Sequence, residues 1–64
     1  MMANKEWQLT KLRNSLKLNK PYVYFLADNG DLGEIEKIVE EYGYKIFYRD
    51  KLFFSTGLFL EKVE

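Results

Sequence analysis

The sequence contains no cysteine and no histidine. These absences exclude disulfide bonds, thiolate nucleophiles, imidazole bases and zinc sites with Cys or His ligands. Mechanisms that use a Ser–His or Cys–His pair are closed to the chain alone, and neither Ser15 nor Ser55 has a candidate base beside it in the sequence. We therefore expect a protein that is not an enzyme and that needs no cofactor and no metal ion.

No apolar run is long enough to cross a membrane. The longest run, Tyr22 to Ala27, has the length of a strand, whereas a transmembrane helix needs about 18 residues or more. Residues 1–6 are mixed in polarity and lack the apolar core of a secretion signal. We expect a cytoplasmic protein with no membrane partner.

The chain is also short. A domain of 64 residues buries only about 60% of the surface that its unfolded chain exposes, so its core is marginal. With 47% hydrophobic, 31% charged and 17% aromatic residues, its composition is typical of a globular protein. No linker, repeat or low-complexity stretch divides it, and we expect one α+β domain over residues 1–64.

Residues 4–19 have the spacing of an amphipathic helix. Three leucines recur at i, i+3 and i+7, Asn4 is placed to cap the first turn, and Pro21 ends the helix. Trp7 and Leu18 lie off this leucine stripe by about half a turn. Trp7 therefore either flanks the core or anchors an interface.

Residues 32–42 predict a second helix. Five apolar residues share one stripe, and Gly43 follows where a C-terminal glycine belongs. Asp31 and Glu34 have the spacing of a capping box. The preceding loop is not a calcium site, because Gly30 and Leu32 occupy positions that need oxygen ligands.

The rest of the chain favours strands. Residues 22–27 predict a strand that is buried on both sides or has one apolar side and one covered by tyrosines. Period-two alternation predicts strands at 44–49 and 51–55, with a turn near Arg49–Asp50 between them. A turn at Thr56–Gly57 leads to a last strand over 58–63. The order is α-β-α-β-β-β.

These lengths predict a small two-layer α+β domain. The strand 22–27, the helix 32–42 and the strand 44–49 fit a right-handed βαβ unit with parallel strands, and the last two strands follow as an antiparallel meander. We expect a mixed four-stranded sheet with both helices on one face. The alternation turns one set of side chains toward the helices: Tyr44, Ile46, Tyr48, Leu52 and Phe54. It turns a second set away from them: Lys45, Phe47, Arg49, Lys51 and Phe53.

Charge is segregated, although the net charge is zero. Residues 1–20 carry five basic residues and one acidic residue, whereas residues 28–41 carry six acidic residues and one basic residue. The basic residues of the first helix could meet an acidic partner or phosphates, or simply face solvent. A net charge near zero also favours association between copies.

The second, outward set of side chains carries the functional prediction. We expect a non-catalytic regulatory or interaction module that acts through protein–protein contact, including a homodimer formed by this aromatic face or by an edge strand. The predicted partner-binding residues are Phe47, Phe53, Lys45, Arg49, Lys51 and Trp7. The alternative is single-stranded nucleic-acid binding, with bases stacked on the phenylalanines and phosphates beside the basic residues. A third possibility is that the N-terminal helix covers this face.

Overall fold

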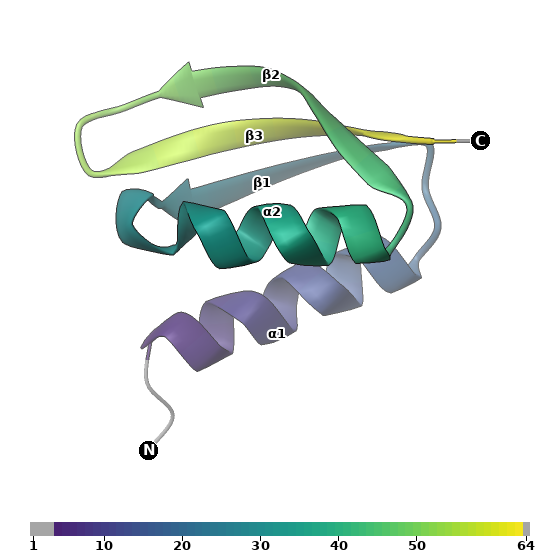
Figure 1. Cartoon of the computed structure of the whole chain (residues 1–64), viewed down its shortest axis with the longest axis horizontal. Coiled ribbons are helices and arrows are strands. Elements are labelled where there is room, and N and C mark those ends of the chain that lie inside the picture. The colour runs from purple at the N-terminus through teal and green to yellow at the C-terminus, as the bar shows by residue number, and fades with distance from the viewer. Residues whose placement is uncertain (1–3, 64) are drawn as a thin grey trace.

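A computed structural model describes residues 4–63 of the chain (Figure 1). The elements in chain order are α1 (Asn4–Lys17), β1 (Tyr22–Asp28), the 3₁₀ turn η1 (Asn29–Asp31), α2 (Leu32–Glu41), β2 (Tyr44–Lys51) and β3 (Ser55–Lys62). Both predicted helices and the first two predicted strands are confirmed, with ends that differ by one to two residues.

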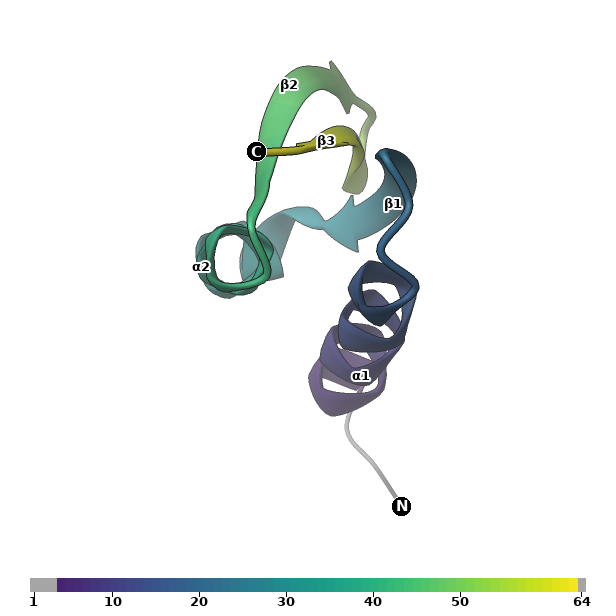
Figure 2. The ribbon, with the colours of Figure 1, turned by 90° about the vertical axis from the view of Figure 1, so that its right-hand side faces the viewer.

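The described residues form two layers. Both helices lie beneath the sheet in Figure 1, and the end-on view of Figure 2 shows them on the same side of it. The opposite face of the sheet is left open by the described part of the chain (Figure 2). The predicted two-layer α+β arrangement is therefore confirmed, and α1 does not cover the outward face.

The predicted mixed sheet of four strands is wrong. Residues 4–63 form three strands in the order β1-β3-β2, and both pairings with β3 are antiparallel. β1 and β2 therefore run parallel to each other, as a βαβ unit requires, but β3 is inserted between them. The predicted crossover from β1 through α2 to β2 is present, but β1 and β2 do not pair with each other as predicted.

The strand count differs because the hairpin turns later than expected. β2 continues through Arg49–Asp50, and the chain reverses at 52–54, where the Leu52 N–H donates to the Ser55 carbonyl at 2.8 Å. Most of the predicted strand over 51–55 is thus a loop, since Lys51 ends β2 and Ser55 begins β3. The predicted turn at Thr56–Gly57 is wrong too, since both residues lie in β3.

A β-bulge divides β2 into two halves. Ile46 pairs with Leu60 and Tyr48 pairs with Phe59, so Phe47 is an additional residue in β2. An extra residue inverts the alternation beyond it. Tyr48 therefore faces outward and Arg49 turns to the helix side, and both predictions were the reverse.

The core lies between the helices and the inner face of the sheet. Its buried residues are Leu9, Leu12, Leu16, Phe25, Ala27, Ile35, Ile38, Val39, Tyr44, Leu58 and Leu60. The three leucines of α1 are buried, as are the three central residues of the apolar stripe of α2, while Leu32 and Tyr42 at its ends are partly buried. The Tyr44 hydroxyl is satisfied inside this core, since it donates to the Lys20 carbonyl at 2.5 Å.

The first turn of α2 differs from the prediction. Within residues 4–63, Asp31 makes no side-chain capping bond, and Glu34 instead forms an ion pair with Lys5 of α1. The hydrogen bond and charge of Glu34 raise the pKa of the Lys5 ammonium above its usual value. The predicted capping box is therefore wrong, while Gly43 ends α2 as predicted, with φ of +81°. The Asn4 side chain, predicted as a cap, lies outside the described residues.

Candidate interaction face

The open side of the sheet is lined by large apolar side chains. Alternation along each strand brings together six residues, which we call the aromatic face: Tyr22, Tyr24 and Leu26 of β1, Phe47 and Tyr48 of β2, and Phe59 of β3. All except Phe59 are between 48% and 61% exposed. Exposed apolar area of this kind is typical of an interaction surface.

The rings contact one another across all three strands. Phe59 lies at the centre, with its ring centroid 4.8 Å from Tyr24, 5.5 Å from Tyr48 and 6.4 Å from Phe47. Tyr22 meets Phe47 edge to face at 6.1 Å. Tilted and edge-to-face pairs at these distances are favourable, so the rings hold one another in a fixed surface.

Gly57 makes room for one of these rings. A Cβ at Gly57 would lie 2.7 Å from the Tyr24 Oη and 3.0 Å from its Cε1, so the Tyr24 ring lies directly over this glycine. An aromatic ring that covers a glycine in a neighbouring strand protects a weak point of the sheet. The glycine is therefore part of the aromatic face and not of a turn.

We expect Gly57→Ala to displace the Tyr24 ring while the protein stays folded. An alanine removes the glycine's conformational cost of about 0.5–1 kcal/mol, and the lost ring packing offsets this by a similar amount. Urea unfolding should therefore show a net change within about 1 kcal/mol. Proton NMR should show loss of the ring-current shift at residue 57, and an unchanged shift would contradict this placement of Tyr24.

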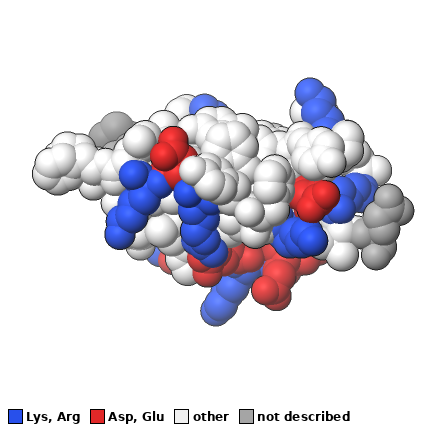
Figure 3. Space-filling model, turned by 90° about the horizontal axis from the view of Figure 1, so that it is seen from above, with Lys and Arg blue, Asp and Glu red and all other residues white. Residues whose placement is uncertain are grey.

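Charged residues are few on this face and stand at its margin. Figure 3 looks down on the open side of the sheet and shows a mainly uncharged centre with basic and acidic side chains around it. Lys45 pairs with Glu61 at 3.6 Å, so one basic residue of the face is matched by a neighbouring carboxylate. Arg49 pairs with Glu36 of α2 at 2.7 Å, away from the aromatic face.

The structure separates the six residues predicted from the sequence. Phe47 and Lys45 lie on the open side, Arg49 lies on the helix side, and Lys51 is exposed at the end of β2. Phe53 is 86% exposed but belongs to the hairpin loop, where it stacks on Phe54 with ring centroids 4.4 Å apart. The bulge and the late turn account for both displacements.

Trp7, the sixth predicted residue, lies elsewhere. It is 55% exposed on α1, and the Lys11 ammonium lies 4.4 Å from its ring centroid. It lines a cleft between α1 and β1 together with Tyr24, Phe25 and Leu26, at the margin of both the core and the aromatic face.

Sequence reasoning missed five members of the aromatic face: Tyr22, Tyr24, Leu26, Tyr48 and Phe59. The signal for the first two was present, because tyrosines alternate with Val23 and Phe25 in β1. Tyr48 was assigned to the wrong side because a bulge leaves no clear mark in the sequence.

The loop between β1 and α2 fastens the hairpin. The Thr56 hydroxyl donates to Asn29 Oδ1 at 2.6 Å, and the Asn29 N–H donates to the Phe54 carbonyl at 3.3 Å. These bonds give Asn29 a structural role that its place in an acidic loop did not indicate. Among the described residues, no group of three or more acidic side chains is arranged to hold a metal ion.

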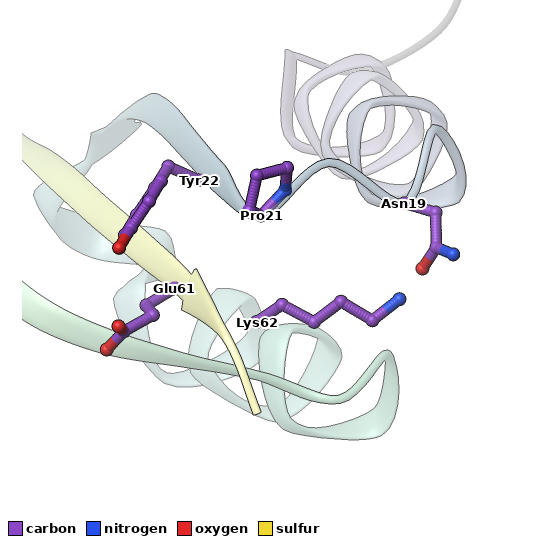
Figure 4. Close-up of a pocket in the computed structure, with 5 residues that line it drawn as sticks. All are labelled: Asn19, Pro21, Tyr22, Glu61 and Lys62. Carbon is purple, nitrogen blue, oxygen red and sulfur yellow. The ribbon is translucent and has the colours of Figure 1, made fainter. Parts of the chain in front are cut away.

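A hollow in the surface lies at the other end of the sheet from the hairpin loop. It has a volume of about 370 Å³ and is lined by Asn19, Pro21, Tyr22, Glu61 and Lys62 (Figure 4). Lys62 extends toward Asn19, whereas Glu61 points away from it. The backbone closes the floor, where the Lys62 N–H donates to the Pro21 carbonyl at 2.9 Å. The two charged groups do not converge on a common point.

Comparison of the chain with protein-family models, with curated proteins and with solved structures found no match. Neither helix within residues 4–63 has the length and apolar character needed to span a bilayer. The functional argument therefore rests on the surface described above.

Proposed function

We propose that this protein is a non-catalytic interaction module that self-associates through its aromatic face. The observation that carries the proposal is the set of interlocked, half-exposed rings on an open sheet face. Rigid aromatic side chains are enriched at protein interfaces because they offer large contact area at low entropic cost.

The size of the aromatic face fits this function. A fully buried aromatic side chain removes 150–250 Å² from solvent, so these half-exposed side chains present on the order of 500 Å². The largest apolar patch of a typical monomer is about 300–600 Å², and a standard interface buries about 800 Å² per partner, rim included. The face supplies the apolar centre of such an interface.

The charges at the margin fit a two-fold dimer. Lys45 and Asp50 both belong to the open side, because they pair with Glu61 and Gly57 of β3. They stand at opposite ends of β2, with the row of Tyr24, Phe59 and Tyr48 between them. A two-fold axis along this row would bring Lys45 of each copy near Asp50 of the other, and such isologous pairing is favourable.

The same face supports nucleic-acid binding less well. Stacking of bases needs phosphate-binding groups beside the rings. Of the three basic residues expected there, Arg49 faces α2 and Lys45 is paired with Glu61. The distribution of charge therefore favours a protein partner over a nucleic acid.

We expect the dissociation constant of the dimer to rise at least about 30-fold in Tyr48→Lys. Truncating or charging a central interface residue costs about 2 kcal/mol or more, and Tyr48 lies in the central row of the aromatic face. Sedimentation equilibrium at micromolar to millimolar protein measures the constant. The matched control is Phe54→Lys, which places the same charge on an exposed aromatic of the hairpin loop.

The salt dependence separates the two candidate functions. Apolar association should persist in about 1 M salt, because burial of rings is not screened. A wild-type chain that remains monomeric at millimolar concentration would contradict the proposal. Submicromolar binding of a single-stranded oligonucleotide that weakens with salt would favour the alternative.

A further inference from the structure

β1 forms one edge of the sheet and directs half of its backbone groups outward. The Lys62 N–H donates to the Pro21 carbonyl, and the Asn29 N–H donates to the Phe54 carbonyl. These two bonds show which residue pairs of the β1–β3 ladder are hydrogen-bonded, because bonded and non-bonded pairs alternate along antiparallel strands. Backbone groups of the odd-numbered residues therefore face β3. Those of the even-numbered residues point to the free edge: Tyr22, Tyr24, Leu26 and Asp28.

The two edges of the sheet differ in their protection. The free edge of β2 carries a bulge and the charged residues Arg49 and Lys51, which are common devices against edge pairing. The β1–β3 register is unbroken over seven residues, and β1 is uncharged from Tyr22 to Ala27. β1 is thus the edge on which another strand can be added.

A side of α1 runs beside this edge. Trp7, Lys11 and Ser15 follow one another at intervals of four residues, which places them on one side of α1, and Leu18 follows in the turn after the helix. Two adjoining clefts of about 290 and 240 Å³ separate them from β1, with Ser15 and Tyr24 lining both. We call this space the edge groove.

The edge groove has an apolar lining with basic groups. Trp7 is 55% and Leu18 65% exposed, so each has surface left to cover. Of the described residues that line the two clefts, the charged ones are Lys11 and Lys20, and both are basic. At the far end, Gln8 Oε1 accepts from the outward Asp28 N–H at 3.3 Å. Gln8 thus accepts a hydrogen bond from an outward N–H of β1, which is the role that a carbonyl of an added strand would have.

We propose that the edge groove binds an extended, acidic segment of another protein as a fourth strand on β1. Main-chain bonds to Tyr24 and Leu26 would supply affinity, while Lys11 and Lys20 select acidic side chains. A second copy fits less well, because antiparallel pairing of β1 with β1 would bring Lys11 of one copy toward Lys20 of the other. Tyr22, Tyr24 and Leu26 border both the edge groove and the aromatic face. The two proposals share the premise of protein contact, but this one uses the backbone edge of β1, whereas the proposed function uses side chains of the open face.

The test is a titration of the full-length protein with a capped hexapeptide of alternating glutamate and valine. Trp7 is the sole tryptophan and lies in the groove, so its emission reports binding there. We expect a blue shift with saturation at micromolar to millimolar peptide, and binding at least about tenfold weaker for a lysine–valine peptide.

Two variants locate the site. Leu26→Pro removes an outward N–H that the sheet does not use, and it should weaken binding by about tenfold or more. Lys51→Pro is its matched control on the β2 edge and should leave affinity unchanged. Lys11→Glu should weaken binding by about fivefold, as expected for reversal of an exposed charge.

Other outcomes would overturn the proposal. These are an unchanged Trp7 emission at about 1 mM peptide, equal affinity in Leu26→Pro, or a peptide-free dimer that Leu26→Pro dissociates and Tyr48→Lys does not. The titration is repeated in Tyr48→Lys, whose altered residue lies outside the edge groove. Peptide binding by Tyr48→Lys, together with a monomeric wild type, would reject the proposed function and support the edge groove. A wild-type dimer that binds no peptide would reject the edge groove and support the proposed function.

Discussion

Replacing Leu60 by alanine is expected to unfold most of the protein at room temperature. Leu60 is fully buried in the central strand, and its β-sheet neighbours are Val23 on one side and Ile46 on the other. A buried Leu→Ala change costs about 2–5 kcal/mol, depending on how far the cavity collapses. A domain of this size is held by roughly 3–5 kcal/mol, so the loss consumes most of its stability. Urea unfolding followed by circular dichroism measures the effect.

The control is the adjacent residue. Phe59 points to the open face, where its ring is only partly buried among Tyr24, Tyr48 and Phe47. Phe59→Ala removes more atoms than Leu60→Ala, but it should cost less than half as much because no core cavity forms. A larger loss in Phe59→Ala than in Leu60→Ala would mean that the two faces of β3 have been assigned the wrong way round.

Sequence patterns predicted the parts of the fold that depend on local periodicity. The leucine spacing of α1, the apolar stripe of α2 and the glycine after it each correspond to a buried face or a helix end in the structure. These signals are local because a helix determines its own side-chain directions. The alternation in β1 likewise indicated which residues lie on each face of the sheet. Its tyrosines, Tyr22 and Tyr24, make up two of the six residues of the aromatic face.

The hairpin was predicted less well, since its geometry depends on non-local contacts. Leu52 and Phe54 alternate with Phe53 as a strand would, yet the bonds of Asn29 to this segment help to hold it as a loop. Gly57 resembled a turn residue, but its missing side chain accommodates the ring of Tyr24 from another strand. Both features need a partner element that sequence spacing does not identify.

The bulge at Phe47 had the largest consequence for the candidate site. Up to Phe47 the predicted directions are right, and from Tyr48 onward they are reversed. This single residue moves Tyr48 onto the aromatic face and removes Arg49 from it, toward Glu36. It therefore changes the face from a basic and aromatic surface, suited to nucleic acid, to a mainly aromatic one, suited to a protein.

Removing one residue from β2 or from β3 should therefore have opposite consequences. Deleting Phe47 removes the bulge and joins Ile46 to Tyr48 with regular alternation. All the remaining side chains of β2 then stay on the face of the sheet that they occupy now. The loss is then the exposed packing of one ring, about 0.5–1.5 kcal/mol, and the protein should stay folded.

Deleting Phe59 instead shifts the end of β3 by one residue relative to both of its neighbours. Leu60 would move to the open side and Glu61 would replace it in the core, between Val23 and Ile46. Burial of an unpaired carboxylate costs several kcal/mol, more than the stability expected of so small a domain. Circular dichroism and urea unfolding should show a folded protein for the first deletion and an unfolded one for the second. Equal damage from the two deletions would contradict the bulge, because a regular β2 would lose its register at Phe47 as β3 does at Phe59.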